Sequence, residues 1–230
     1  VRPSWFLQMA VSALSSLPAV CVVFSGEDKS FPHFDNLRAI WSGGAGVTPA
    51  AWMLGGLVRD KGEDVEHSGA PCLLRMLAGG LDPLTARLWL LSTAYRKPLA
   101  LTRDALSMWE KNRLRIQELA VALAERAHGA GRAVDKAGGP LHEAFVAALE
   151  DDLGLYRFWP TLFARCRDLN ASLAQGKLGA EEASSSLADI RAVNAALGVL
   201  DEKAMPVPQS AWPARTAALA AEREQARARK

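Results

Sequence analysis

Two adjacent carboxylates in this sequence could take part in acid–base catalysis. Asp151 and Asp152 could act together as a general acid and a general base. They stand at the predicted end of a helix, however, and no other catalytic group is indicated near them. We therefore interpret this pair as structural, and we predict no catalytic residue in the chain.

The three cysteines are the next candidates, either as nucleophiles or as metal ligands. Cys21, Cys72 and Cys166 are far apart in the sequence and odd in number. This spacing favours free thiols in a reducing cytoplasm over a disulfide framework or a C-x-x-C zinc site. We therefore expect a cytoplasmic protein without a metal site built from cysteine pairs.

Basic side chains indicate a third kind of chemistry, the binding of a polyanion. The whole chain carries a formal net charge of only +2, so such a partner must meet a local patch of cations. Binding to an RNA backbone requires little more than spaced cations. The residues that we predict to bind nucleic acid follow one another through the middle of the chain: Arg87, Arg96, Lys97, Arg103, Arg113 and Arg115.

The same stretch supports a second interpretation. Two further cations, Lys111 and Arg126, are accompanied by carboxylates that partly offset the positive charge, at Asp104, Glu110, Glu118 and Glu125. A helix face of mixed charge is also typical of a surface that is only solvated. Both interpretations of these residues stay open at the level of sequence.

A helix that begins after Asp82 is expected to position the first of these cations. Asp82 can cap the helix, and Pro83 suits its first position. Apolar residues then recur at helical spacing, which predicts one buried face, at Leu84, Leu88 and Leu91. Pro98 is predicted to end the helix.

The residues before this helix have the pattern of an α/β fold. Ala19–Phe24 is a continuous apolar run, which is typical of a buried strand in a parallel sheet. Phe31–Gly44 predicts a short amphipathic helix that glycines end. The N-terminal stretch has an apolar middle that Pro3 and Pro18 interrupt, so we predict no targeting segment. No apolar run reaches the roughly 18 residues that a membrane span needs.

The residues after Leu101 have the pattern of successive amphipathic helices. Apolar side chains recur at helical spacing over residues 102–128, 140–153, 158–173 and 181–197. Short connections between them, several with glycine, predict that neighbouring helices run in opposite directions. We therefore expect an antiparallel helical bundle.

Three segments resemble the signatures of one family. Residues 82–99 contain D-P-L-x-x-R followed by L-S-x-x-Y-R-x-P-L, residues 2–5 read R-P-S-W, and residues 31–36 read F-P-H-F-D-N. The order and spacing of these segments are similar to those of the cysteinyl-tRNA synthetases, which are class I aminoacyl-tRNA synthetases. The resemblance covers nearly the whole chain and begins midway through the family's catalytic domain.

The resemblance implies a zinc site whose ligands this chain largely lacks. In the family, two cysteines, a histidine and a glutamate hold a zinc ion that recognises the substrate thiol. Met9 stands in place of one cysteine and Leu37 in place of the glutamate, and only His33 remains. We expect His33 to be a packed or hydrogen-bonded remnant, and we expect no zinc.

The resemblance also implies an ATP-binding loop, K-M-S-K-S, whose lysines stabilise charge on the phosphates. The corresponding residues here are Gly62–Gly69, with Asp64 and His67 in place of the lysines. The acidic side chains of this loop would repel a triphosphate. We therefore expect no cofactor, although the family uses both ATP and zinc.

These inferences predict a mainly α-helical chain with two domains. Residues 1–81 would be part of a class I catalytic domain, a remnant of a Rossmann-like α/β nucleotide-binding fold. Residues 82–230 would be the junction and helical bundle that resemble the anticodon-binding side of a synthetase. The expected function is that of a cysteinyl-tRNA synthetase-like protein that lacks cysteine activation and retains binding to tRNA or another nucleic acid.

Two alternatives remain. The chain could be a fragment of a working, ATP-dependent cysteine–tRNA ligase that needs a second chain. It could instead be a protein–protein interaction module, because a half-domain leaves strand edges exposed. Aromatic side chains would then either cover the half-domain internally or form an interface in a homodimer or with a protein partner: Trp5, Phe34, Trp41 and Trp52. We expect no interaction with a membrane.

Overall fold

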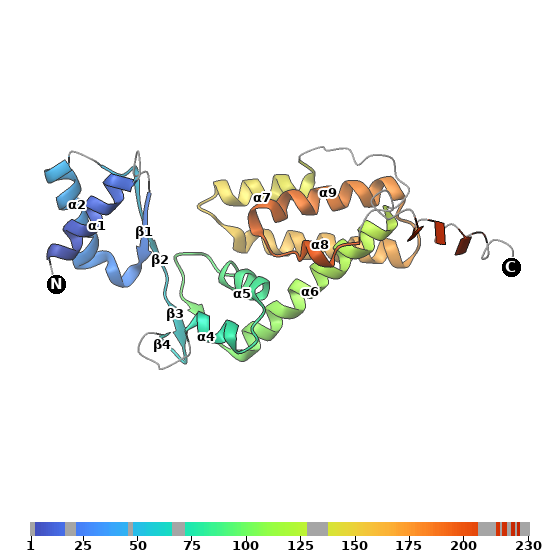
Figure 1. Cartoon of the computed structure of the whole chain (residues 1–230), viewed down its shortest axis with the longest axis horizontal. Coiled ribbons are helices and arrows are strands. Elements are labelled where there is room, and N and C mark those ends of the chain that lie inside the picture. The colour runs from blue at the N-terminus through green and yellow to red at the C-terminus, as the bar shows by residue number, and fades with distance from the viewer. Residues whose placement is uncertain are drawn as a thin grey trace. The chain divides into compact units, whose positions relative to one another are not determined.

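The computed structural model describes residues 3–16, 22–45, 48–65, 72–127 and 138–206, together with Arg215, Thr216, Ala218, Leu219, Glu222, Arg223 and Gln225 in the tail. The chain is mostly helical, with small sheets, as Figure 1 shows, so the prediction of a mainly α-helical protein is confirmed. It divides into two compact units, Val1–Gly80 with Thr93–Ala105, and Leu81–Ser92 with Leu106–Lys230.

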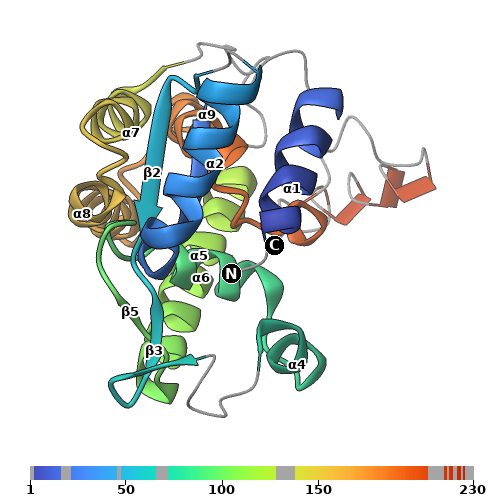
Figure 2. The same ribbon diagram turned by 90° about the vertical axis from the view of Figure 1, so that its left-hand side faces the viewer.

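The first unit contains a pair of parallel strands and two helices. Strand β1 (Val22–Gly26) pairs with β2 (Ala51–Gly55), and Val22 lies opposite Ala51. The strand that we predicted at residues 19–24 therefore includes at least residues 22–24, and residues 19–21 lie outside the described part. The prediction that this strand is buried is wrong for the described residues, because Val22 is 51% and Phe24 is 61% exposed. Helices α1 (Pro3–Ser16) and α2 (Asp35–Ile40) pack against each other, side by side in Figure 2.

The core of this unit forms where apolar side chains of α1 and α2 are buried. Phe6 and Ala10 of α1 are buried, and so are Leu37 of α2 and Trp41 in the wider helical turn that follows it. Trp52 of β2 stacks against Trp41, with ring centroids 5.6 Å apart. This contact packs the sheet against α2.

A second, small sheet lies in the same unit and corrects one prediction. Strand β3 (Val58–Asp60) pairs antiparallel with β4 (Glu63–Asp64) and parallel with β5 (Leu99–Ala100). The helix predicted to continue to Pro98 is therefore wrong in its second half. The Tyr95 carbonyl accepts a hydrogen bond from Gly56 N at 2.6 Å, and Leu99 N donates to Leu57 O at 2.9 Å. The segment instead forms a turn, in which Lys97 N donates to the Ala94 carbonyl at 2.8 Å, and the long-range bonds hold this turn and β5 in place.

The second unit consists of helices. The short helix α4 (Leu73–Ala78) still belongs to the first unit. The helices of the second unit are α5 (Pro83–Leu90), α6 (Arg103–Arg126), α7 (Pro140–Glu150), α8 (Leu155–Ala174) and α9 (Ala180–Leu197). The first turn of α6 belongs to the first unit. Asp82 caps α5 as predicted, because its carboxylate accepts from Thr85 N at 2.8 Å. The four helices predicted after Leu101 are observed with ends shifted by a few residues, whereas α5 ends at Leu90, well before its predicted end at Pro98.

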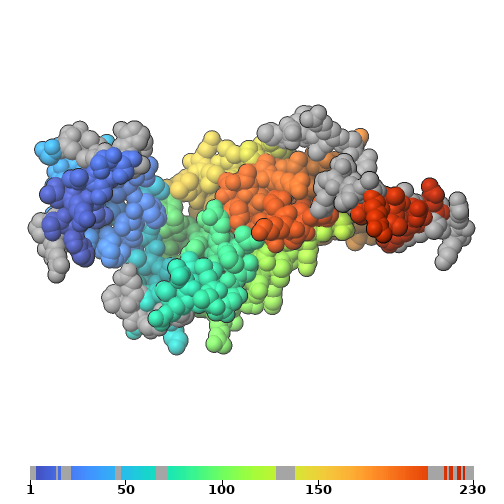
Figure 3. All heavy atoms as spheres, in the orientation of Figure 1, coloured from blue at the N-terminus to red at the C-terminus, as the bar shows by residue number. Residues whose placement is uncertain are grey.

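Aromatic side chains bring the helices of this unit together. Trp109 of α6 contacts Trp159 of α8, with ring centroids 5.8 Å apart, and Phe145 of α7 contacts Phe158 of α8 at 5.2 Å. Phe158 is almost fully buried. Figure 3 shows α9, in orange, lying directly against α5, in green. Within the described residues, no helix is both long enough and apolar enough to cross a membrane.

Candidate nucleic-acid interface

The six predicted nucleic-acid-binding residues lie on two units. Arg96, Lys97 and Arg103 belong to the first unit, and Arg87, Arg113 and Arg115 belong to the second. The structure brings residues of the set together only within each unit, so each unit has to be considered by itself. The local contacts of these side chains separate those that support the fold from those that face solvent.

Arg87 supports the fold of the second unit. Its Nε donates a hydrogen bond to the Leu197 carbonyl, and its Nη2 donates to the Ala196 carbonyl at 3.2 Å. Both carbonyls belong to the last turn of α9, where no backbone N–H of the helix is available to pair with them. Gly198 then ends α9 with a φ of 60°, a left-handed conformation that glycine adopts readily. Arg87 therefore fastens α5 to the C-terminus of α9.

Arg113 is also engaged inside the second unit. Its Nε lies 2.9 Å from Asp82 Oδ2 and 3.0 Å from Thr85 Oγ1, and its side chain is only 11% exposed. Arg113 thus joins α6 to the cap of α5. Partial burial by itself would raise the pKa of Asp82, but hydrogen bonds from Thr85 and the charge of Arg113 outweigh it, so this pKa is lowered.

Arg96 and Lys97 are exposed in the turn before β5. The guanidinium of Arg96 lies over the ring of Tyr95, with 4.8 Å from Cζ to the ring centroid, which is a cation–π arrangement. The backbone of Lys97 approaches Gly56 so closely that a Cβ there would lie 2.3 Å from the Lys97 carbonyl. Glycine is therefore required at residue 56 for this turn to form.

The remaining cations lie on α6. Arg103 and Arg115 are exposed, and so is Lys111, which lies one turn before Arg115. Within the described part of the chain, none of these three makes a hydrogen bond or an ion pair through its side chain. Arg126, near the end of the helix, donates from Nε to the Leu178 carbonyl at 2.7 Å.

The residues that replace the expected zinc ligands do not form a set of metal donors. Leu37 is 4% exposed in the core, Met9 is 54% exposed on α1, and the ring of His33 packs edge-on against Phe6 at 5.3 Å. His33 Nδ1 is buried without a hydrogen-bond partner among the described residues. A leucine, an outward-facing thioether and one imidazole do not fit the donor set of a structural or catalytic zinc ion.

Within the described ranges, no group of three or more His, Cys, Asp or Glu side chains is placed so that it could hold a metal ion. The loop that resembles the ATP site begins at β4, where Asp64 lies 3.5 Å from Arg59, measured from Oδ1 to Nε. Glu27 also approaches Arg59, at 3.9 Å. His67 lies outside the described residues.

Asp151 and Asp152 follow α7 in a turn rather than ending its last helical turn. Asp152 and Leu153 have positive φ values of 54° and 55°, so α7 ends at Glu150. The carboxylate of Asp151 forms an ion pair with Arg157 on α8. This contact connects the turn to the next helix.

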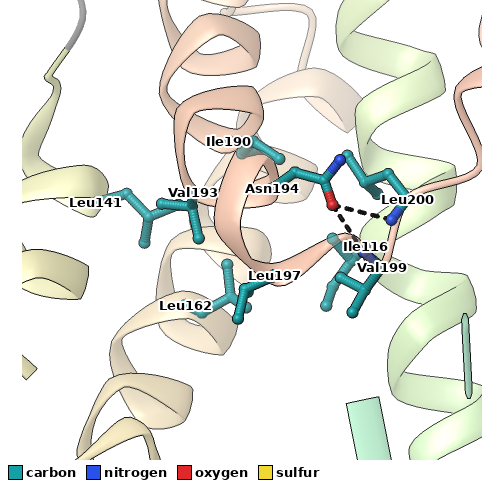
Figure 4. Close-up of a pocket in the computed structure, with 9 residues that line it drawn as sticks. All are labelled: Ile116, Leu141, Leu162, Ile190, Val193, Asn194, Leu197, Val199 and Leu200. Carbon is teal, nitrogen blue, oxygen red and sulfur yellow. Dashed lines mark hydrogen bonds between the residues drawn. The ribbon is translucent and has the colours of Figure 1, made fainter. Parts of the chain in front are cut away.

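Figure 4 shows a small cavity inside the second unit. Its volume is about 10 Å³, roughly the room that one water molecule needs, and its lining is almost entirely apolar: Ile116, Leu141, Leu162, Ile190, Val193, Asn194, Leu197, Val199 and Leu200. Asn194 Oδ1 accepts from Val199 N at 2.8 Å and from Leu200 N at 3.0 Å. This cavity is a packing defect, because it is too small for a substrate.

Sequence reasoning missed the cations of α8. Arg167 is exposed and stands four residues after Phe163, so the two side chains share a face of the helix. Phe163 in turn packs against Trp109 of α6, with ring centroids 6.3 Å apart. The i, i+4 spacing to an aromatic residue was the available signal, but it acquires meaning only once α6 and α8 are known to be neighbours.

Comparisons with known proteins give a consistent result. No family model matches the chain. A cysteine–tRNA ligase from Clavibacter sepedonicus is 30% identical over 205 residues, and one from Hamiltonella defensa is 28% identical over 204 residues; these matches cover 86% and 87% of this chain. The chain spans about two fifths of the length of these curated relatives, since each match covers 42% of the relative.

A solved structure shares the fold. It is named as an arginyl-tRNA synthetase from Campylobacter jejuni, and it superposes with a TM-score of 0.50 at 14% identity. The superposition covers 84% of this chain and 49% of that one. At this identity the likeness shows the fold and nothing more.

Proposed function

Because the chain resembles part of the cysteine–tRNA ligase family, we propose that it is a synthetase-like protein that binds tRNA or another nucleic acid and does not itself activate cysteine. The observation that carries the proposal is the contrast between two sets of positions. Exposed cations remain on α6, at Arg103, Lys111 and Arg115. The positions of the expected zinc site, by contrast, hold a buried leucine and an outward-facing methionine.

The arrangement of the first unit supports a remnant of a Rossmann-like domain. Strands β1 and β2 are parallel, and parallel strands occur in α/β folds with helices against their faces. Here α2 provides such a helix, since Phe34, directly before α2, contacts Trp52 of β2 with ring centroids 5.0 Å apart. In this proposal, residues 1–81 derive from a nucleotide-binding domain.

The contacts of the second unit support an antiparallel order of neighbouring helices. Phe145 near the middle of α7 meets Phe158 near the start of α8, while Leu141 at the start of α7 shares the cavity lining with Leu162, further along α8. These two contacts support opposite directions for α7 and α8. We propose that residues 82–230 are the part of the fold that lies beside tRNA.

The loss of cysteine activation follows from the chemistry of the zinc positions. Zinc holds a substrate thiolate because both are soft and few competing amino acids supply such a ligand. Leu37 cannot coordinate a metal, and its burial among apolar side chains would make a carboxylate there costly. In the same proposal, neither zinc nor ATP is a cofactor of this chain, and a cytoplasmic location would suit a partner of tRNA.

The test is ATP–pyrophosphate exchange in the presence of cysteine. We expect the purified chain to show no exchange above a reaction without protein, because the groups that would select cysteine and hold the triphosphate are replaced. Robust exchange by the chain alone would overturn the proposal. Exchange that appears only when a second polypeptide is added would favour the alternative of a ligase fragment.

A second candidate function is protein–protein interaction, which the surface of the first unit favours. Two aromatic side chains, Trp5 of α1 and Phe24 of β1, are each 61% exposed. Large exposed apolar side chains on neighbouring elements are typical of surfaces that contact another protein. This candidate would explain the first unit, whereas nucleic-acid binding concerns the second.

A further inference from the structure

Helices α6 and α8 contact each other through side chains at several points. Trp109 of α6 contacts Trp159 and Phe163 of α8, and Arg126 near the end of α6 reaches the Leu178 carbonyl just beyond α8. Between these points lies Cys166, which is buried in α8. Burial raises the pKa of this thiol to about 11, and the nearby charge of Arg115 opposes the rise. The contacts follow the same order along both helices, so α6 and α8 run in the same direction.

Cations line this contact from both helices. Lys111 and Arg115 are four residues apart on α6, so they lie on one face and about 6 Å apart along the helix axis. Arg115 is the residue that approaches α8. Arg167 follows Cys166 directly, is exposed, and shares its face of α8 with Phe163, the residue that packs against α6. All three cations therefore flank the same contact between two helices.

The three side chains are available to a ligand. Lys111, Arg115 and Arg167 are exposed, and within the described residues none is held by a hydrogen bond or ion pair of its side chain. The carboxylate nearest in sequence on α8, Asp168, lies 100° further around the helix, away from the contact. On α6, Glu110 directly precedes Lys111, and Glu118 lies one turn after Arg115 on the same side of the helix, so these two carboxylates partly offset the positive charge.

We propose that Lys111, Arg115 and Arg167 form a phosphate-binding strip along the α6–α8 contact, and that its ligand is the sugar–phosphate backbone of RNA. The strip rests on the proposed function, which it makes specific. Only Arg115 is shared with the six residues predicted from sequence. Lys111 and Arg167 are added, Arg96, Lys97 and Arg103 are left out, and Arg87 and Arg113 are assigned to the fold, since both are bonded internally. Three cations without base-reading partners bind phosphate and give little sequence discrimination.

The experiment is a titration of the full chain with tRNA at several salt concentrations. Each cation that neutralises a phosphate contributes about 0.7 to 0.9 to the slope of log affinity against log salt. The triple variant Lys111→Gln, Arg115→Gln and Arg167→Gln should therefore lower the magnitude of the slope by about 2 to 3. At low salt we expect its affinity to fall on the order of tenfold or more.

A matched control removes the same charge from the same unit. The triple variant Arg157→Gln, Arg191→Gln and Lys203→Gln changes three exposed cations away from the α6–α8 contact, and it should leave the salt slope within about 0.5 of that of the unchanged protein. A third variant, Lys111→Arg, Arg115→Lys and Arg167→Lys, keeps the charges and should retain binding. Thermal unfolding verifies that all three variants are folded.

The outcomes separate the strip from the proposed function. If the unchanged chain binds tRNA but the control triple weakens binding as much as the strip triple does, the strip is wrong and nucleic-acid binding stands. If the charge-conserving variant loses binding while folded, phosphate contact is not the cause and the strip is also wrong. If the unchanged chain fails to bind tRNA even at low salt, the proposed function itself is overturned.

Discussion

Arg113, which the sequence predicts to bind nucleic acid, stabilises the fold instead through an ion pair with Asp82. Asp82 Oδ2 accepts from both Thr85 N and Thr85 Oγ1 at 2.8 Å and lies 2.9 Å from Arg113 Nε. Two donors and a guanidinium favour the charged form of the carboxylate, so its pKa is lowered in the folded chain despite partial burial.

This shift predicts a dependence of stability on pH. Because the pKa of Asp82 is lower in the folded state, its contribution is fully present above the unfolded value of about 3.9 and is lost as the pH falls through the folded value. The variant Asp82→Asn should therefore be less stable than the unchanged protein at pH 6, and the difference should shrink on acidification to about pH 3. Urea denaturation at the two pH values measures it; a constant difference would contradict this account.

Asp189 acts at the scale of an element, because it caps a helix other than its own. Its Oδ1 accepts from Gly139 N at 3.2 Å and His142 N at 2.9 Å, and its Oδ2 accepts from Leu141 N at 2.9 Å. These donors belong to the first turn of α7, which has no side-chain cap from its own sequence. A Cβ on Gly139 would lie 2.5 Å from Asp189 Oδ2, so glycine is required for this approach.

Removal of this carboxylate should destabilise the second unit. We expect Asp189→Ala to lower the free energy of unfolding by about 2 kcal/mol, since three backbone donors lose a charged acceptor. The control Asp168→Ala removes an exposed carboxylate from α8 and should change stability by less than about 0.5 kcal/mol. Urea denaturation followed by circular dichroism compares the two variants; equal losses would show that Asp189 is not a cap.

The elements that depend on local pattern were predictable, and those that depend on distant contacts were not. The cap of α5 and the apolar stripes of α6 to α9 predicted these helices, because both signals are local in the sequence. The segment from Tyr95 to Leu99 was mistaken for helix, because its hydrogen bonds go to residues 56 and 57, nearly forty positions earlier. The contact of Asp189 with α7 spans a similar distance and has no signature in either segment.

The candidate site was predictable to a lesser extent. The sequence assigns the six predicted cations to the junction and α6, but it gives no means to separate Arg87, which bonds the end of α9, from Arg115, which faces solvent. Only tertiary contacts make that distinction. The contribution of Arg167 required knowledge of which face of α8 meets α6.

At the scale of the whole molecule, apolar exposure differs between the units. In the first unit, Phe34, Trp41 and Trp52 pack against one another, so three of the four aromatic residues considered from sequence cover the half-domain internally. Trp5 remains exposed. Further large apolar side chains are exposed on α1 and β1: Leu7, Met9, Val11, Val22 and Phe24. A two-stranded sheet with such a surface has little stability of its own.

This surface predicts self-association of the full chain. We expect light scattering to show an average mass that rises with concentration, because burial of exposed apolar side chains is favourable. The double variant Trp5→Glu and Phe24→Lys should reduce the rise, whereas Leu74→Glu, on the separate helix α4, serves as the control for an exposed apolar residue elsewhere. A mass of one chain at every concentration would contradict the prediction.

The burial of Cys166 beside Arg115 has a practical consequence for reactivity. A thiol with a pKa of about 11 is almost entirely protonated at neutral pH, and only the thiolate is a good nucleophile. Cys72, in contrast, is exposed. Alkylation of Cys166 therefore requires the α6–α8 contact to open. Under native conditions, the rate of alkylation depends on how often this contact opens. The same contact carries the proposed strip, so a bound polyanion that bridges the two helices would slow the modification of a thiol that it never touches.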